Sequence, residues 1–191
     1  IFGSSMGVLK KDFKYKLIKN FFTKEETKIG CYYFLLRHKR NIADFDFKQV
    51  SNTCDSSFYG DFFGDTMLIK KTRLVEEVTG LKLFPTYTFT RVYSFNADLK
   101  KHKDRPSCEV SISDMWGSCG TKWPIYMEDK PFEMEPGDAV VYLGCEIPHY
   151  RKPFTGDWHA QSFLHYVDQN GPHKDFKFDK RNAFDNPSIN V

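Results

Sequence analysis

The segment TYTFTRVYSF, residues 86–95, constrains the fold most strongly, because its side chains alternate in character along its whole length. Successive side chains of a β-strand point to opposite faces of a sheet, so this alternation predicts a strand and not a helix. One predicted face carries Tyr87, Phe89, Arg91, Tyr93 and Phe95, and the other carries Thr86, Thr88, Thr90, Val92 and Ser94.

Further short strands are predicted after this one, at CEVSIS, KWPIYM, DAVVYLG and WHAQSFLHYV, with turns between them that contain Gly, Pro or Asp. The 19 Phe, 10 Tyr and 3 Trp also favour a β-rich fold. Many short strands at this spacing predict a sandwich or a jelly-roll barrel.

Two helices are predicted before these strands. Thr23 and Glu26 form a capping box that opens a helix reaching about Arg40, whose predicted inner stripe is Ile29, Tyr32, Tyr33 and Leu36. A second helix is predicted over residues 65–79, because Gly80 stands where a left-handed C-terminal residue belongs. FKYKLIKNFF alternates like a strand, and residues 41–63 are predicted to form a long loop.

These elements together predict a β-rich α+β fold. The 191 residues fit one domain, and we expect a single domain over residues 1–191. In that domain residues 1–80 provide helical support, residues 81–170 form the jelly-roll core and residues 171–191 form a polar surface tail.

Charge, cysteine content and hydropathy indicate which partners and which location to expect. The 28 Lys and Arg are spread among 25 Asp and Glu, without the clustered basic face that a nucleic-acid partner requires. Five widely spaced cysteines without a C-x-x-C pair favour reduced thiols, so a cytoplasmic location is expected. No apolar run approaches the roughly 20 residues of a membrane span, so no membrane partner is expected.

The tripeptide His-Lys-Asp occurs twice, at residues 102–104 and 173–175. Alternate residues share one side of a strand, so His102 and Asp104 can bind one metal ion together. His149, after a Pro-Gly-Asp turn and a buried strand, offers a third ligand. Two histidines and one carboxylate on one face of a ferrous ion leave three positions open for an organic acid and dioxygen. The second copy lies in the turn-rich tail and is expected to be solvated.

Two long segments carry a family resemblance. PTYTFTRVYSFNADLKKHKDRPSCEVSIS and EMEPGDAVVYLGCEIPHYRKPFTGDWHAQSFLHYV together resemble the iron(II)- and 2-oxoglutarate-dependent dioxygenases, especially their prolyl-4-hydroxylase-like branch. The resemblance covers roughly residues 81–167 and implies a double-stranded β-helix supported by helices from residues 1–80. It also implies that His102, Asp104 and His149 bind iron(II), with 2-oxoglutarate as cosubstrate and O2 as the oxidant.

One element of the family pattern differs. The family usually has Arg or Lys nine or ten residues after the distal histidine, to pair with the far carboxylate of 2-oxoglutarate, and here these positions are Trp158 and His159. Either His159 and Gln161 bind this carboxylate from one strand face, or Arg91 or Arg105 reaches it from elsewhere. Tyr93 is expected in the cavity near the chelated end of the acid.

The resemblance implies hydroxylation of an aliphatic C–H group, on a prolyl or other peptidyl side chain or on a small metabolite, coupled to decarboxylation of 2-oxoglutarate to succinate. The prime substrate is not specified by the sequence. Two alternatives stay open. The first is a metal-binding, cupin-like isomerase or hydrolase, because His and Asp also bind zinc or manganese. The second is a non-catalytic jelly-roll binding module in which the histidines are structural.

Overall fold

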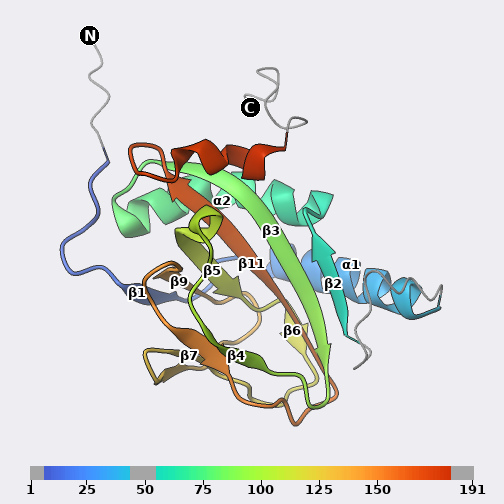
Figure 1. Ribbon diagram of the computed structural model, residues 1–191. Helices are drawn as coiled ribbons and strands as arrows, with labels where there is room; N and C mark the ends of the chain where they lie inside the picture. The colour runs from blue at the N-terminus through green and yellow to red at the C-terminus, as the bar shows by residue number, and fades with distance from the viewer. Residues whose placement is uncertain (1–6, 44–54, 182–191) are drawn as a thin grey trace.

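The computed structural model of the chain describes residues 7–43 and 55–181. Figure 1 shows the arrangement of the elements, with two long strands, β3 and β11, running side by side through the centre. The helical elements are α1 (Lys24–Ala43), α2 (Phe62–Thr79) and two 3-10 segments, η1 (Pro106–Cys108) and η2 (Lys174–Lys180). Part of the expected loop at residues 41–63 and the end of the expected tail fall on residues 44–54 and 182–191, outside the described residues.

The strands form two antiparallel sheets. The major sheet has the order β1 (Tyr15–Ile18), β9 (Ala139–Leu143), β5 (Val110–Asp114), β11 (Trp158–Asp168), β3 (Leu83–Ser94) and β2 (Ser56–Tyr59), with β6 (Gly117–Ser118) paired to β11. The minor sheet has the order β4 (Leu99–His102), β10 (His149–Arg151), β7 (Ile125–Met127) and β8 (Lys130–Phe132).

The chain passes repeatedly between the two sheets from β3 onward. β3, β5, β9 and β11 lie in the major sheet, whereas β4, β7, β8 and β10 lie in the minor sheet. This alternation is the double-stranded β-helix that the resemblance implies, so the predicted β-rich α+β fold with a jelly-roll core is confirmed.

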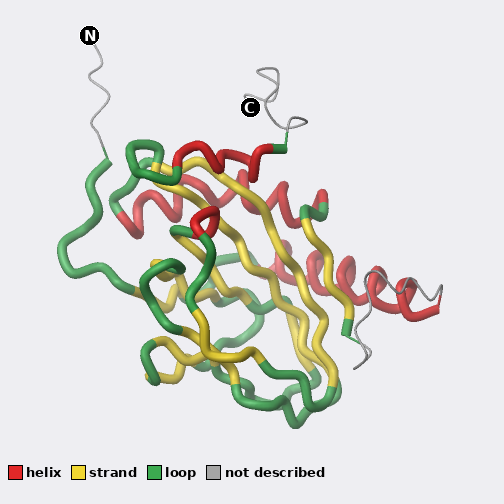
Figure 2. Tube along the Cα trace, viewed as in Figure 1, coloured by secondary structure: helices red, strands yellow, loops and turns green. Residues whose placement is uncertain are grey.

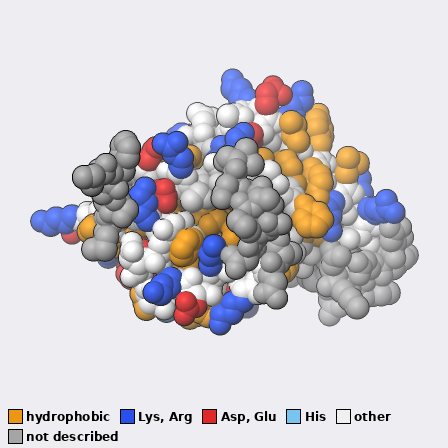
Figure 3. Space-filling view, turned by 90° about the horizontal axis from the view of Figure 1, so that it is seen from above, with side chains coloured by type: hydrophobic (Ala, Val, Ile, Leu, Met, Phe, Trp, Pro, Cys, Tyr) orange, Lys and Arg blue, Asp and Glu red, His pale blue; other side chains and the backbone are white. Residues whose placement is uncertain are grey.

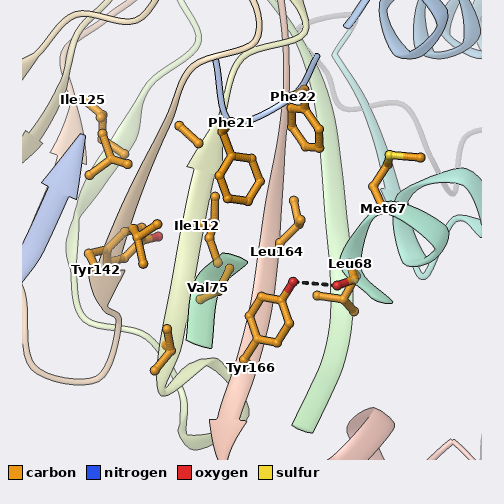
Figure 4. Close-up of a cluster of buried hydrophobic side chains, with 14 of the residues drawn as sticks. Phe21, Phe22, Met67, Leu68, Val75, Ile112, Ile125, Tyr142, Leu164 and Tyr166 are labelled. Atoms are coloured by element: carbon orange, nitrogen blue, oxygen red, sulfur yellow. Dashed lines mark hydrogen bonds between the residues drawn. The ribbon is translucent and has the colours of Figure 1, made fainter. Parts of the chain in front are cut away.

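The helices cover the face of the major sheet that points away from the minor sheet. Figure 2 shows the helices grouped beside the strands rather than between them, and α2 packs against β3 and β11. The hydrophobic core fills this interface, as Figure 4 shows for Phe21, Val75 and Leu164. The Tyr166 hydroxyl donates to the Leu68 carbonyl at 2.6 Å, so the one polar group of this side chain is satisfied inside the core.

The helix termini follow the sequence signals. Glu26 N donates to Thr23 Oγ1 and Thr23 N donates to the Glu26 carboxylate, so the predicted capping box is confirmed. Gly80 has a φ of 86° and ends α2 as predicted. The beginning of α2 was predicted too late, because the carboxylate of Asp61 caps the helix by accepting from Phe63 N and Gly64 N. β2 was also missed, and it lies inside the segment that was predicted to be a loop.

The predicted inner stripe of α1 is wrong at three of its four residues, and only Tyr33 packs against the core. Ile29, Tyr32 and Leu36 are 56%, 60% and 67% exposed, and the buried face instead carries Gly30 and Phe34. The reason is a close contact, because a Cβ on Gly30 would lie 2.3 Å from the ring of Trp116. The face of α1 that contains Gly30 therefore packs against Trp116, and Ile29, Tyr32 and Leu36 lie on the exposed side.

Two further observations concern the surface. Among the described residues no helix is both long and apolar enough to cross a membrane. Figure 3 shows Lys and Arg side chains interspersed with Asp and Glu on the face it presents, rather than gathered in one basic patch.

Candidate active site

Three predicted metal ligands come together where β4 and β10 pair. His102 ends β4 and stands opposite His149, the first residue of β10, with ring centroids 4.3 Å apart. Asp104 Oδ1 lies 3.4 Å from His102 Nε2 and 3.3 Å from His149 Nε2. The three ligand atoms all lie within 4.8 Å of one another, so this set can hold one metal ion. We call His102, Asp104 and His149 the ligand trio.

Both histidines of the ligand trio are oriented by backbone carbonyls. His102 Nδ1 lies 2.6 Å from the Lys100 carbonyl oxygen, and His149 Nδ1 lies 2.9 Å from the Ile147 carbonyl oxygen. A carbonyl only accepts hydrogen bonds, so Nδ1 carries a proton in each ring, and Nε2 is the nitrogen that faces Asp104. In both imidazoles Nε2 is therefore the atom that would bind a metal ion, after losing any proton it shares with Asp104.

The carboxylate of Asp104 is held equally firmly. Its backbone N donates to the Gly144 carbonyl at 2.8 Å, and Ser111 Oγ donates to Oδ2 at 3.0 Å. A Cβ on Gly144 would lie only 2.5 Å from Oδ2, so glycine is needed for this close approach. Burial alone would raise the pKa of Asp104, but hydrogen bonds from His102 and His149 outweigh it and hold the pKa below its usual range. The group is therefore anionic at neutral pH, as a metal ligand must be.

A second group of possible ligands overlaps the first. Asp104, Cys108 and His165 also lie within 4.8 Å of one another. The Cys108 thiol, however, already contacts the Tyr87 hydroxyl at 3.2 Å, and burial raises its pKa to about 12. His165 Nδ1 lies 2.8 Å from Ser111 Oγ, so this histidine supports the serine that orients Asp104. His165 is thus a buried histidine with a hydrogen-bond partner inside the barrel.

A cavity of about 340 Å³ opens beside the ligand trio. Its wall on β3 is made of alternate residues, as the sequence pattern predicted for one face of this strand: Tyr87, Phe89, Arg91 and Tyr93. Phe163 and His165 of β11 and residues 102–105 complete much of the rest. The cavity is thus lined mainly by aromatic rings on one side and by the ligand trio on the other.

A cluster of buried polar side chains lies farther inside, between the sheets. It consists of Tyr93, Arg151, His159 and Gln161, each at most 2% exposed, and we call it the interior cluster. His159 stands opposite Tyr93 and Gln161 opposite Arg91 in the pairing of β11 with β3. The Tyr93 hydroxyl, Nε and Nη2 of Arg151, both ring nitrogens of His159 and both amide atoms of Gln161 are buried without a hydrogen-bond partner of normal geometry.

The electrostatics of the interior cluster favour an anion. Burial lowers the pKa of Arg151 to about 10, which still leaves the guanidinium cationic at neutral pH. Burial and, secondarily, the charge of Arg151 hold the pKa of His159 well below its usual value, so His159 is neutral. Unpaired buried charges and donors are costly. A bound carboxylate would satisfy Arg151 together with the neighbouring donors, so the residues present fit a ligand with an anionic group.

Arg151 is a residue that the sequence reasoning missed. It lies two positions after His149 on β10, and the buried, half-buried, buried pattern of this strand turns both side chains inward. The signal was therefore present, as a basic residue in phase with the distal histidine. Its guanidinium also lies over the Trp123 ring at 4.7 Å and donates to the Trp123 carbonyl.

The other predicted cosubstrate residues are placed differently from one another. Arg91 lies over the Tyr93 ring at 4.4 Å and pairs with Asp55 at 3.1 Å. Arg105 lines the cavity but pairs with Asp179, at 3.1 and 3.0 Å between the nitrogen and oxygen pairs. The structure thus brings Tyr93, His159, Gln161 and Arg91 together, and places Arg105 apart from them.

The second His-Lys-Asp copy differs from the first in its surroundings. Asp175 is exposed on η2, and neither it nor His173 belongs to a group of possible metal ligands among the described residues.

Comparisons with known proteins agree with the fold. No family model matches the sequence, and no curated protein sequence matches it. A prolyl-4-hydroxylase from Pseudomonas putida has a similar structure, with a TM-score of 0.58 and 16% identity over 82% of this chain and 94% of that one. A viral collagen prolyl hydroxylase from Paramecium Bursaria Chlorella virus-1, solved as a 2OG complex, gives a TM-score of 0.61 and 11% identity over 81% and 96% of the two chains.

A third similar structure has a different activity. The non-heme alpha ketoglutarate dependent epimerase SnoN from nogalamycin biosynthesis gives a TM-score of 0.60 and 10% identity over 81% of this chain and 78% of that one. The resemblance stated from the sequence is therefore confirmed for the fold, which this chain shares with 2-oxoglutarate-dependent iron oxygenases. At these identities the similarity extends to the fold alone.

Proposed function

We propose that the protein is an Fe(II)- and 2-oxoglutarate-dependent dioxygenase that hydroxylates an aliphatic C–H group of a peptidyl side chain or a small metabolite. The observation that carries this proposal is the pairing of two sites in one barrel. The ligand trio can hold a metal ion, and the interior cluster presents a buried cation with unpaired donors. A 2-oxo acid with a second carboxylate has one group for each site.

The ligand trio supports iron binding through its donor set. Two neutral imidazole nitrogens and one carboxylate leave positions on an octahedral ion open to other ligands. When bound, the iron supplies the oxidative chemistry that couples dioxygen and decarboxylation of 2-oxoglutarate to hydroxylation. The protein residues fix the orientation of the ligands and keep the charge of Asp104 in place.

The interior cluster supports cosubstrate binding through Arg151. Its guanidinium would pair with the far carboxylate, and Tyr93, His159 and Gln161 would donate or accept the remaining hydrogen bonds. This assignment moves the cationic role from His159, whose pKa is held far below neutrality, to a residue on the neighbouring sheet. His159 then acts as a neutral hydrogen-bonding group.

The aromatic cavity supports the presence of a prime substrate beside the metal. Tyr87, Phe89 and Phe163 contribute apolar surface that excludes water from this space. Reactions at unactivated C–H groups need such exclusion, because water would compete for the oxidising centre.

An anaerobic titration tests the proposal. Fe(II) and then 2-oxoglutarate are added to the protein, the visible charge-transfer band is recorded, and succinate is measured after oxygen is admitted. The proposal requires both the band and succinate. Metal binding without either would favour the cupin-like isomerase or hydrolase, and failure to bind metal would favour the non-catalytic binding module.

A further inference from the structure

Two arginines line the cavity beside the ligand trio, and they are held in different ways. Arg91 pairs with Asp55, which is 2% exposed and also accepts from Ser94 N and Ser94 Oγ at 2.6 Å each. Without Asp55, its partners Arg91 and Ser94 on β3 would lose the carboxylate that accepts their hydrogen bonds. Arg91 is therefore a fixed part of the sheet.

Arg105 is held by a partner from the end of the described chain. Its side chain is 49% exposed, its guanidinium lies over the Tyr87 ring at 4.7 Å, and it forms a two-point pair with Asp179. Tyr59 also donates its hydroxyl to Asp179. Arg105 directly follows the metal ligand Asp104, so its guanidinium stands at the cavity next to the ligand trio.

The segment that carries Asp179 is strained. Phe178, Asp179 and Lys180 have φ values of 49°, 52° and 61°, so three consecutive residues with side chains adopt the left-handed region. This conformation is unfavourable for L-residues and is normally seen at single positions. η2 packs on β3, and after the strained run Arg181 binds Asp65 at 2.6 Å. The strained run is therefore held at its centre, by Asp179 on Arg105, and just after its end, by Arg181 on Asp65.

We propose that Arg105 recognises the prime substrate, and that this substrate carries a carboxylate which takes the place of Asp179. The proposal rests on the proposed oxygenase function for the meaning of the cavity. The Asp179 carboxylate already occupies the guanidinium edge in the two-point geometry that a substrate carboxylate would use. Exchange frees the strained run, which lowers the cost of displacing an existing partner. The same exchange at Arg91 would break its pair with the buried Asp55, and no strained segment would be released in return.

Paired probes test this inference. N-acetylated amino acids and their primary amides are titrated calorimetrically into protein loaded with Fe(II) and 2-oxoglutarate under anaerobic conditions. We expect acids to bind, and each to lose about tenfold or more in affinity as its amide, because a charge-assisted two-point pair is lost. Arg105→Met should remove this preference for acids.

The contacts of Asp179 with Arg105 and Tyr59 provide matched variants. Asp179→Asn should tighten binding of the acids about two- to fivefold, the scale of a partly exposed ion pair, and Tyr59→Phe should act in the same direction to a smaller extent. Asp175→Asn, an exposed change on the same segment, should have no effect. Hydrogen exchange of residues 173–181 should accelerate when an acid binds to the wild-type protein.

The outcomes separate this inference from the proposed function. Equal binding of acids and amides would overturn it, as would unchanged affinity for acids in Asp179→Asn. If no acid binds to the wild-type protein or to Asp179→Asn, in preparations that show the charge-transfer band with 2-oxoglutarate, the inference is also overturned. The proposed oxygenase function would then still stand. Absence of the band in the wild-type protein would count against the oxygenase itself. Hydrogen exchange of residues 173–181 in Asp179→Asn is a separate measurement, because it requires no turnover.

Discussion

The ligand trio and the interior cluster are both groups of polar side chains in the same barrel, but only the first is satisfied by the protein itself. Each histidine of the ligand trio has a carbonyl at Nδ1, and Asp104 has Ser111 and a backbone donor to Gly144. In the interior cluster the Tyr93 hydroxyl, two nitrogens of Arg151 and the polar atoms of His159 and Gln161 have no such partners.

The difference shows two ways of preparing a site. The ligand trio is preorganised, because its hydrogen bonds fix tautomer, orientation and charge before any ion arrives. The interior cluster is left incomplete, and native proteins rarely leave so many buried polar atoms unpaired. We infer that a ligand completes it, and each prediction below either breaks this contrast or makes it sharper.

The largest effect is expected at the ligand trio, where the duplicated tripeptide supplies its own control. Asp104→Ala removes a metal ligand and its negative charge, so Fe(II) affinity should fall by about a thousandfold or more. Asp175→Ala follows the same His-Lys pair but changes an exposed residue, so stability should shift by less than about 0.5 kcal/mol and metal affinity should not change. Anaerobic metal titrations of both variants decide this. Loss of metal binding in Asp175→Ala would show that the metal site belongs to the second copy of the tripeptide, not the first.

A second prediction concerns the ligand-free interior cluster. Arg151→Met should leave the stability of the apoprotein unchanged or raise it by about 1 to 3 kcal/mol, because it removes an unpaired buried charge. Arg91→Met is the matched control and should destabilise, because it leaves buried Asp55 without its cation. Chemical denaturation of the two variants measures this. A clear loss of stability in Arg151→Met would make Arg151 a structural residue.

The third prediction separates hydrogen bonding from charge at His159. His159→Ala should weaken 2-oxoglutarate binding by about 1 to 3 kcal/mol, the scale of a hydrogen bond to a charged group. His159→Gln retains neutral donor and acceptor atoms and should lose less. Calorimetric titration compares them, and equal affinity in the wild-type and Ala proteins would remove His159 from the cosubstrate site.

The fourth prediction tests the support behind Asp104. Ser111→Ala removes the hydroxyl that donates to Oδ2, so metal affinity should fall by about tenfold, the lower end for residues that orient ligands. Ser111→Thr keeps the hydroxyl and should restore most of the affinity. Metal titration at constant pH provides the measurement, and an unchanged dissociation constant in the Ala variant would show that Asp104 needs no such support.

The smallest effect is a pH dependence from His165. Burial lowers the pKa of His165 to about 4 in the folded protein, below its usual 6.5. Between these values the unfolded chain binds a proton that the folded chain does not, so the free energy of unfolding should decrease as pH falls, by at most about 1.4 kcal/mol per pH unit. Denaturation of metal-free protein at pH 7 and pH 5 should show a shallower dependence in His165→Asn. Parallel curves would mean that His165 is protonated in the folded state.

The parts of the fold that the sequence predicted are those with local physical signals. The capping box at Thr23, Gly80 at the end of α2 and the alternation of β3 each depend on neighbouring residues, and the structure has all three. The inner face of α1 was wrong because it depends on a contact between Gly30 and Trp116, residues far apart in the chain. No local pattern reports such a contact.

The candidate site follows the same division. His102, Asp104 and His149 were found from spacing and strand context, and the structure brings them together. Arg151 does not follow from the family pattern, which places the basic residue on the strand that is β11 here, although β10 presents the same inward phase. The pairing of Arg105 with Asp179 joins residues 74 positions apart in the chain, so it could be seen only in the folded chain.

The central claim is that the interior cluster binds the far carboxylate of 2-oxoglutarate through Arg151. The most direct test titrates 2-oxoglutarate and 2-oxopentanoate, which has a methyl group in place of that carboxylate, into wild-type and Arg151→Met proteins loaded with Mn(II). We predict that Arg151→Met weakens 2-oxoglutarate binding by about 2 to 4 kcal/mol and changes 2-oxopentanoate binding by less than about 0.5 kcal/mol. Equal weakening of both acids, or unchanged binding of 2-oxoglutarate, would contradict the claim.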